Sequence, residues 1–524
     1  MKQRVSRVRL QFLVLAVLAS WPIAASAQTE SDGPNGETVM SAQSQNTSDI
    51  LNKVDQLVEQ NKQLEKQNQE LIDQIQVLRQ RLVTSSGKVP ESDQTAQPPV
   101  LTSAVASIPA SGESDRPADT QTIAEAGRKW GTYTPGLGFK VADTNYGDMN
   151  ISLYSYVRYL NQQGLADSYT NYFGNVTSVQ PQNNFQILKV QLKFLGWVMS
   201  PKFRYFLYTW TSNASQGQGA QVVVAGNLGY TFNKYITLSG GINALPGVRS
   251  LEGNFPYWLS VDTRQIADEF FRPSYTSGIW ARGQITNKLR YQAMLGNNLS
   301  QLGVSALQLD NGLNTVSTAL VWAPSTGEFG AGFGDFEHHE SVATRLAVHF
   351  TRSHEDKQSQ PNTEAIQNTQ IRLTDGSIIF TPNLFGPGIT VNDVNYQMTS
   401  VDSGVKYHGY AVEGEYYFRW LNNFGGPGTA GLSQIFDHGF QVQTSTMVVP
   451  KSFQLYLGGS TVFGKYGHPW DVRAGMNWFP WKNRVVRWNT EGLYLYNSPV
   501  GYSSVPFQVG GHGFVFHSNF EMAF

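Results

Sequence analysis

The last twelve residues of the chain, 513–524, alternate between large apolar side chains and polar or small ones. One set of alternate positions carries five large apolar groups and one serine: Phe514, Phe516, Ser518, Phe520, Met522 and Phe524. The interleaved set is Val515, His517, Asn519, Glu521 and Ala523. A period of two predicts a β-strand with one apolar and one polar face. Lipid can cover such an apolar face, and about 9–11 tilted residues suffice to cross a bilayer. The pattern therefore favours a membrane-crossing strand over its alternative, the last strand of a soluble sandwich.

The same alternation recurs from about residue 149 onwards. In the stretch 410–420, for example, Tyr410, Val412 and Tyr416 alternate with Glu413 and Glu415. Sixteen segments are predicted as strands, near 149–160, 184–199, 202–212, 221–232, 235–243, 275–285, 288–298, 313–323, 341–352, 396–408, 410–420, 439–449, 452–463, 470–479, 484–496 and 513–524. Single-chain bacterial barrels have an even number of strands, with apolar residues towards lipid and polar residues towards the lumen.

Short and long connections separate the predicted strands. Tight links at 200–202, 233–234, 287–288, 450–451 and 481–483 indicate hairpins. Long polar stretches lie at 161–183, 244–274, 353–395, 421–437 and 497–510. Short turns at one end and long loops at the other are typical of outer-membrane barrels. The sequence therefore predicts an all-β fold, a 16-stranded antiparallel transmembrane β-barrel over residues 147–524.

The first 27 residues are predicted to be a secretory signal peptide. Basic residues at positions 2, 4, 7 and 9 precede an apolar run from Leu10 to Ala24, and the small residues 25–27 provide a cleavage site. The alternative, an anchor helix, is disfavoured because no further long apolar run follows. A polar tail, 28–48, comes next.

Residues 49–82 carry a seven-residue repeat. Its d positions are Ile50, Leu57, Leu64, Leu71 and Leu78, and its a positions are Val54, Asn61, Asn68, Ile75 and Leu82. This repeat predicts a left-handed coiled coil that pairs with copies of itself, while the two Asn residues leave the number of chains open. A lone amphipathic helix lying on a membrane is the alternative. Residues 83–146 are predicted to be a flexible linker in the periplasm, because the part up to 129 is rich in Pro, Ser, Thr and Ala and has no aromatic residue.

Composition supports this division of the chain. Of 12 Trp, 24 Tyr and 29 Phe residues, only Phe12 and Trp21 precede Trp130. The mean hydropathy of −0.31 argues against a bundle of membrane helices. From Trp130 onwards, 25 Lys and Arg residues nearly balance 24 Asp and Glu residues. Bulk charge therefore gives no case for nucleic-acid binding, and no nucleic-acid partner is predicted.

Charged residues in the predicted third loop and on the predicted lumen face are the candidate functional residues. If the loop 244–274 narrows a water-filled pore, its mixed charges would face one another and select among polar solutes. The candidates for the pore constriction are Arg249, Glu252, Asp262, Arg264, Asp268, Glu269 and Arg272. The candidates for the pore wall are Lys189, Lys193, Arg204, Arg282 and Arg290. Further lumen cations are Arg345 and Arg473, near the acids Asp402, Glu413, Glu415 and Glu491. The alternative role of the loop charges is to hold the loop against the wall through ion pairs.

Three stretches resemble the phosphate-selective porin (O/P) family: VDTRQIADEFFRPSYTSGIWARGQ (261–284), VDSGVKYHGYAVEGEYYFRW (401–420) and GFQVQTSTMVVPKSFQLYLGG (439–459). The terminal Phe524 also resembles the end of the closing strand of bacterial outer-membrane barrels. The resemblance covers about residues 149–524 and implies a trimeric channel with an inward-folded third loop. Some relatives carry an N-terminal coiled coil, which favours a homotrimer over a dimer. The arginine ladder of the phosphate-selective members cannot be mapped onto this chain residue by residue.

The predicted function is passive diffusion of small polar or anionic solutes through a porin in the outer membrane of a Gram-negative bacterium, with the N-terminal part in the periplasm. The predicted partners are membrane lipid, lipopolysaccharide and two further copies of the chain, with no cofactor and no metal. The alternative is a structural protein that tethers the outer membrane to the periplasmic layer. An enzyme is disfavoured, because the Glu-His-His-Glu cluster at 337–340 is typical of a solvated turn and no serine has His and Asp partners at a recognisable spacing.

Overall fold

The structure is a computed structural model that describes residues 131–134, 137–187, 189–211, 222–251, 258–300, 312–330, 332–357, 371–501 and 506–524. All of these residues belong to the second of two compact units, which spans Ile108–Phe524. The signal peptide, the polar tail, the coiled coil and residues 83–130 of the linker lie outside the described residues and stay predictions.

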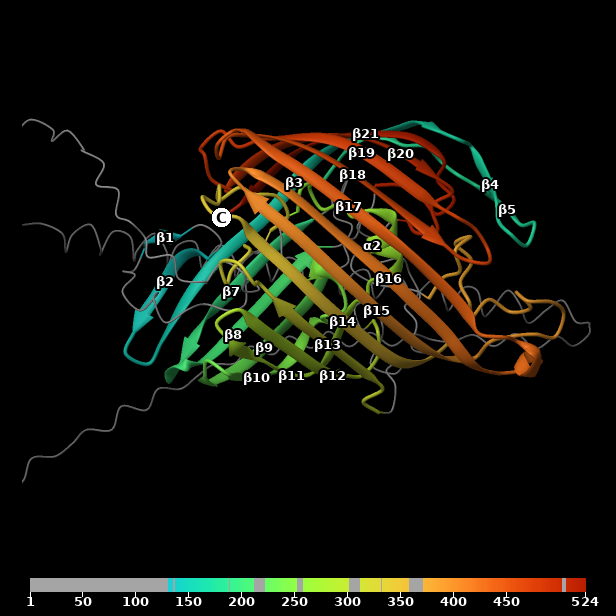
Figure 1. Cartoon of the computed structure of the whole chain (residues 1–524), viewed down its shortest axis with the longest axis horizontal. Helices are drawn as coiled ribbons and strands as arrows, with labels where there is room; N and C mark the ends of the chain where they lie inside the picture. The colour runs from blue at the N-terminus through green and yellow to red at the C-terminus, as the bar shows by residue number, and fades with distance from the viewer. Residues whose placement is uncertain are drawn as a thin grey trace, which may run out of the picture. The chain divides into compact units, whose positions relative to one another are not determined.

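Sixteen antiparallel strands, each paired with the next along the chain, form a closed barrel (Figure 1). The first eight are β3 (Gly147–Leu165), β7 (Val190–Val198), β8 (Ser200–Thr211), β9 (Val222–Asn233), β10 (Ile236–Ala244), β11 (Tyr275–Thr286), β12 (Leu289–Gly296) and β13 (Thr315–Trp322). The second eight are β14 (Ala343–Asp356), β15 (Asp393–Tyr407), β16 (Tyr410–Gly425), β17 (Ile435–Val449), β18 (Phe453–Phe463), β19 (Trp470–Trp478), β20 (Val486–Tyr496) and β21 (Gly513–Ala523). β21 closes the barrel against β3, from Gly513 opposite Leu165 to Ala523 opposite Tyr154. The predicted fold class is confirmed.

The two faces of the wall differ as the alternation predicts. On β21, Phe514 and Phe520 point outward, and Phe520 is 53% exposed. His517, Asn519 and Glu521 on the same strand are buried inside the barrel. An outer surface of apolar side chains is stable when lipid surrounds it, because lipid removes those side chains from water.

The sheet begins earlier in the chain than residue 147. β2 (Gly138–Thr144) pairs with the start of β3, and β1 (Tyr133–Thr134) pairs with β2. The ring of Phe139 lies 6.0 Å from the ring of Phe524. Lys140 forms an ion pair of 3.4 Å with Asp148 on β3. Ordered strand therefore occupies part of the range predicted to be linker. The prediction missed β2 because a strand this short shows no clear period of its own in the sequence.

The first long connection also contains more strand than the alternation predicts. β3 continues to Leu165, and a small hairpin of β4 (Ser168–Thr170) and β5 (Val176–Ser178) follows. The predicted strand 184–199 is divided into β6 (Asn183–Gln186) and β7, which both pair with β3. β6 is mostly polar, so the apolar period that marks the other strands does not distinguish it.

Connections at the two ends of the barrel differ in length. At the end that holds the C-terminus, β7 and β8 are joined by one residue, and β15 and β16 by two. The connection from β13 to β14 is the exception at this end, because it spans residues 323–342. Among the residues that the structure describes, helical structure is confined to short segments: η2 (Arg249–Leu251), η4 (Thr429–Gly431) and α2 (Ile266–Phe271). Within the described residues, no helix is both long and apolar enough to cross a membrane.

Candidate functional site

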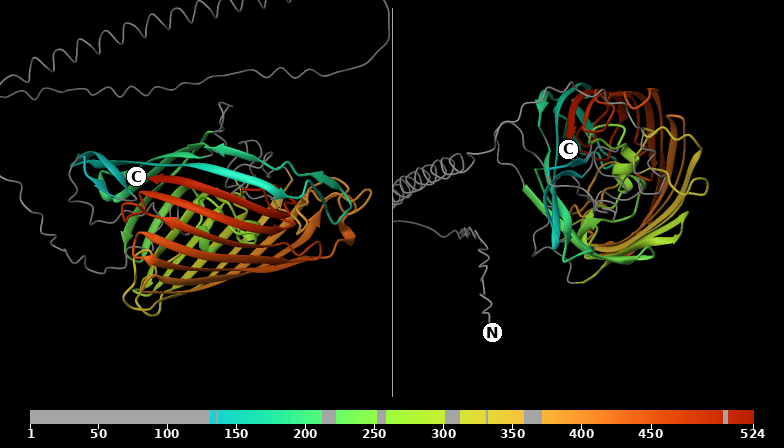
Figure 2. Two further views of the ribbon diagram at one scale, coloured as in Figure 1. Left: turned by 90° about the horizontal axis from the view of Figure 1, so that it is seen from above. Right: turned by 90° about the vertical axis from the view of Figure 1, so that its left-hand side faces the viewer.

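We define the third loop as residues 245–274 between β10 and β11; its described parts, 245–251 and 258–274, lie inside the barrel. Figure 2 shows α2 within the ring of strands when the barrel is viewed from one end. Its Phe270 and Phe271 are buried, and the ring of Phe271 stacks at 5.1 Å on Tyr417 of β16. The loop thus has an apolar side that packs against one part of the wall.

Ion pairs fasten the third loop to opposite sides of the barrel. Arg249 pairs with Glu413 on β16 at 3.1 Å, and its backbone N–H donates to Glu415 at the same distance. Asp262 pairs with Lys189, just before β7, at 2.7 Å. All of these charged side chains are buried. A buried charge is stable only when it is paired and hydrogen-bonded, so these contacts fix the position of the loop.

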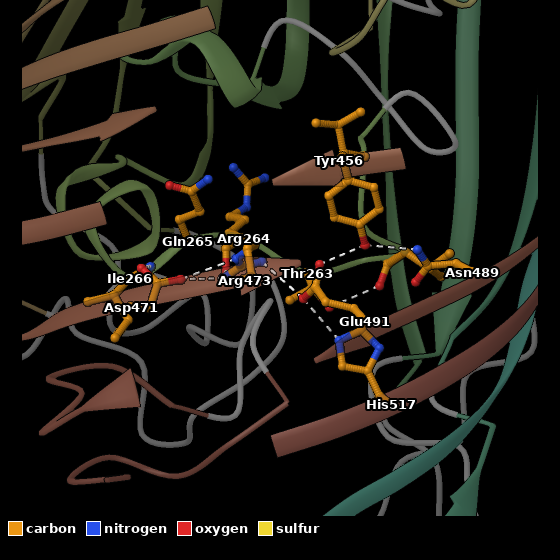
Figure 3. A network of polar contacts seen from close by, with 12 residues as sticks. Thr263, Arg264, Gln265, Ile266, Tyr456, Asp471, Arg473, Asn489, Glu491 and His517 are labelled. Atoms are coloured by element: carbon orange, nitrogen blue, oxygen red, sulfur yellow. Dashed lines mark hydrogen bonds and ion pairs between the residues drawn. The ribbon is translucent and has the colours of Figure 1, made fainter. Parts of the chain in front are cut away.

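A second set of contacts holds the N-terminal end of α2 (Figure 3). The backbone N–H of Ile266 donates to Asp471 at 3.2 Å, and Arg473 donates to the carbonyl oxygen of Arg264 at 2.8 Å. Asp471 and Arg473 also pair with each other at 2.7 Å. Behind them, Glu491 accepts hydrogen bonds from Tyr456 at 2.7 Å and is paired with His517 at 3.2 Å. Side chains of β18 to β21 thus form one network beneath the loop.

The remaining loop charges are largely engaged with one another. Arg272 pairs with Glu269 at 2.6 Å, and Arg264 pairs with Asp268 at 3.4 Å and with Glu269 at 3.5 Å. All four side chains are buried. Of the seven predicted constriction residues, Glu252 lies outside the described residues. The structure brings the other six together within one loop, and their contact with solute stays a prediction.

The predicted pore-wall cations all lie on the inward-facing register of their strands. Lys193 alternates with the buried Leu195 on β7, and Arg204 alternates with the buried Phe206 on β8. Arg282 shares the register of the buried Trp280, and Arg290 is opposite Gln284 of β11. Lys189 differs from these four because it pairs with the third loop. Their role in conduction stays a prediction.

The inward charges divide the barrel into two regions. The strands β7 to β13, as described, contain no aspartate or glutamate; we call this region the acid-free wall. The strands β14 to β21 together with β3 carry many inward charges of both signs; we call this region the paired wall. Its ion pairs include Arg345–Asp402 (2.6 Å), Arg419–Asp437 (2.7 Å) and Arg487–Glu521 (2.6 Å). The third loop therefore packs chiefly on the wall that offers charged partners.

Three inward side chains of the paired wall, His349, Asp402 and Glu415, are close enough to share a metal ion. Each is already engaged within the protein. His349 bonds to Asp402 at 2.7 Å and, through its other nitrogen, to the carbonyl oxygen of Pro246 at 2.9 Å. Glu415 accepts from Ser400 at 2.7 Å and from Arg249. These contacts bind the start of the third loop, which accounts for the cluster without a metal.

Sequence reasoning missed the connection 323–342. Its Phe329, Phe333 and Phe336 are buried, and Asp335 is completely enclosed. His339, in the cluster interpreted as a solvated turn, is held by Asp335 and by Glu328, the latter at 3.0 Å. Two signals in the sequence could have indicated an inward-folded segment. The connection is long although it lies at the end with short turns, and its phenylalanines are separated by glycines.

No protein-family model matches the chain, and no curated protein sequence matches it. Several solved structures are similar. The outer-membrane protein OmpT of Vibrio cholerae is 11% identical, and the match covers 73% of this chain and 99% of that chain with a TM-score of 0.45. The anion-selective porin from Comamonas acidovorans is 7% identical over 72% of this chain and 100% of that chain, with a TM-score of 0.44. The outer-membrane channel DcaP of Acinetobacter baumannii is 9% identical over 74% and 99%, with a TM-score of 0.43.

Proposed function

We propose that this protein is an outer-membrane porin through which small polar or anionic solutes diffuse passively, with a weak preference for anions. The third loop narrows the lumen, and solute passes between the loop and the acid-free wall. The outward apolar face of the barrel and the predicted signal peptide support a location in the outer membrane. The N-terminal part lies in the periplasm, where the heptad repeat at 49–82 supports self-association as a homotrimer.

One observation carries this proposal: the inward register of the acid-free wall presents only positive charges. Lys193, Arg204, Arg282 and Arg290 lie on it, and the described strands β7 to β13 contain no aspartate or glutamate. The described acids of the third loop, Asp262, Asp268 and Glu269, form ion pairs with its own arginines and with Lys189. Fixed charge of one sign along a narrow aqueous path favours solutes of the opposite sign.

The preference is expected to be weak, without a tight phosphate site. A tight site needs several donors converging on one anion. The described cations of the acid-free wall instead lie on four strands, β7, β8, β11 and β12. A weak anion preference therefore does not require phosphate recognition. The resemblance to the phosphate-selective porins would imply such recognition.

Reversal potentials in planar bilayers under a KCl gradient test the proposal. We expect a modest anion preference that falls in Lys193→Gln and in Arg282→Gln. Lys451→Gln is the matched control, because Lys451 is exposed at the turn between β17 and β18. Cation preference of the unmodified channel would refute the assignment of these residues to the solute path. Block of chloride current by micromolar phosphate would favour dedicated phosphate recognition instead.

A further inference from the structure

The connection 323–342 enters the barrel from the end that carries the short turns. Phe329 is fully buried and Phe333 is 6% exposed, so the middle of the connection does not lie in solvent. Gly330 and Gly334 adopt positive φ angles of 81° and 77°, which residues other than glycine rarely adopt. A Cβ atom at Gly334 would lie 2.5 Å from the side-chain nitrogen of Gln454 on β18. The backbone itself therefore packs against the wall.

A cluster of three buried charges holds the tip of this connection. Lys406 of β15 donates to the carbonyl oxygen of Gly332 at 2.6 Å, and its ammonium lies 4.4 Å from the ring centre of Phe329. Glu413 of β16 accepts from the backbone N–H of Gly334 at 3.3 Å. Arg249 donates to the same Gly332 carbonyl oxygen at 3.2 Å. Because charged donors and acceptors make the stronger hydrogen bonds, these contacts hold the segment in place.

The base of the connection is fastened separately. Asp335 accepts from the backbone N–H of Gly409, in the turn between β15 and β16, at 2.7 Å. The ring of Phe336 lies 4.9 Å from the ring of Phe479, and the guanidinium of Arg484 lies 4.5 Å from the Phe336 ring. These contacts join the connection to the neighbouring short turns, so it is attached along its length.

The connection meets the third loop inside the barrel. Arg249 belongs to the third loop, yet it bonds to Gly332 and lies 4.9 Å from the ring centre of Phe333. Phe333 also packs in one buried cluster with Trp258 and Leu259 of the same loop. Two segments that enter from opposite ends of the barrel are thus joined through Arg249, and both lie against the paired wall.

We propose that residues 329–330 and 332–336 form an inward-folded plug that narrows the lumen from the short-turn end and supports the third loop, with Lys406 and Glu413 as its positioning residues. The effect on conduction rests on the proposed channel function, whereas the position of the plug does not. The plug fills space beside the paired wall at the short-turn end, and the third loop does so from the opposite end. Together they confine solute to the acid-free wall. Glu413 is shared by Arg249, Lys406 and Gly334, so release of the plug also loosens the third loop.

Thiol labelling tests the position of the plug without any measurement of current. The chain has no cysteine, so a single Phe333→Cys substitution gives one reactive site. Glu337→Cys is the reference, because position 337 is exposed in the same connection. We expect position 333 to react much more slowly than position 337 in folded protein. Equal labelling rates would overturn the proposal. So would protection of position 333 that persists when Lys406 or Glu413, which together we call the latch, is substituted.

The latch is tested by combining Phe333→Cys with Lys406→Met, and with Lys451→Met as the matched control. Loss of hydrogen bonds from a charged donor is expected to raise the labelling rate at position 333 by at least about tenfold. Lys451→Met should leave the rate unchanged. Glu413→Gln serves as the second variant if Lys406→Met fails to fold, which heat-dependent gel mobility shows directly.

Single-channel conductance then tests what the plug does to the pore. Replacement of residues 329–336 by a glycine–serine segment of equal length should give a larger conductance or frequent current fluctuations. An unchanged conductance, with position 333 protected in the parent protein, would show that the plug is present but does not narrow the path. A parent protein that conducts no ions would contradict the proposed function and leave the labelling result intact.

Discussion

The acid-free wall and the paired wall are alike on the outside and different on the inside. Both present apolar side chains outward: Leu320 on β13 is 45% exposed and Phe520 on β21 is 53% exposed. Inside, the paired wall matches its charges with one another and with the third loop, whereas the described acid-free wall carries cations alone. The barrel therefore has one wall that anchors the chain and one wall that faces solute under the proposed function.

Two neighbouring lysines, Lys189 just before β7 and Lys193 on β7, show what this difference means. Lys189 and Lys193 are four positions apart and both buried. Lys189 pairs with Asp262 at 2.7 Å. Among the described residues, no hydrogen-bond or ion-pair partner of Lys193 is found. The same residue type is thus an anchor at one position and a candidate for solute contact at the other, and burial alone does not distinguish them.

The largest expected effect comes from breaking the anchor. Lys189→Met leaves the Asp262 carboxylate buried without its ion-pair partner, which we expect to cost about 3–5 kcal/mol in the free energy of unfolding. Lys193→Met should change the unfolding free energy much less. Urea titration of the folded barrel in detergent, followed by tryptophan fluorescence, measures both. The double variant Lys189→Met/Asp262→Asn should recover part of the lost free energy of unfolding. If Lys189→Met and Lys193→Met destabilise the barrel equally, the proposed distinction between the two lysines is wrong.

A charge on the outer surface should affect both walls equally. Leu320→Lys and Phe520→Lys each place a charge towards lipid, at a cost of about 2–4 kcal/mol near the middle of the bilayer. The same urea titration, made in lipid vesicles, compares the two variants. A large difference between them would mean that the walls differ outside as well as inside.

The connection 323–342, which contains the plug, offers a pH-dependent contact. Burial alone would lower the pKa of His339, but hydrogen bonds and negative charges from Asp335 and Glu328 outweigh it and raise the pKa to about 9. The pKa of Asp335 is lowered, because hydrogen bonds from His339 and Gly409 and the charge of His339 outweigh burial. A raised folded-state pKa means that the contact stabilises the fold fully below the ordinary histidine pKa of about 6.5 and loses this contribution as the pH rises through about 9.

Nitrogen NMR of labelled histidine measures this shift directly. His339→Gln identifies its signal among the nine histidines. We expect a titration midpoint near pH 9 in the intact channel and a lower midpoint in Glu328→Gln. A midpoint near the ordinary value of about 6.5 would show that His339 is not held between the two carboxylates.

The sequence predicted the wall of the barrel better than its contents. The period of two on β21 and β16 follows directly from one face meeting lipid and the other the lumen, so strand number and facing could be read from local pattern. The partners inside could not. Arg249 and Glu413 are 164 positions apart, and the bond between Arg249 and Gly332 joins segments from opposite ends of the barrel. Such contacts depend on how two connections pack together, which a local period does not encode.

The same limit explains the mixed result for the candidate charges. The alternation placed Lys193, Arg204 and Arg282 on the inward register because that register follows from the strand itself. It could not separate Lys189 from Lys193, because the distinguishing feature is Asp262 on a distant loop. It also passed over the plug, since a connection without a strand or helix gives no period to recognise.

The smallest expected effect comes from placing one acid on each wall. Gln292 of β12 lies opposite Arg282, at a half-buried inward position of the acid-free wall. Gln292→Glu adds an acid beside a proposed pore cation, so it should lower the anion preference in reversal-potential measurements with little loss of stability.

Gln441→Glu is the matched substitution on the paired wall, where Gln441 is buried and donates to Glu415 at 3.3 Å. There the new carboxylate would lose that hydrogen bond and face a like charge, so we expect lower stability and little change in selectivity. If the two variants exchange these effects, solute follows the wall that we have assigned to anchoring, and the division of the lumen is reversed.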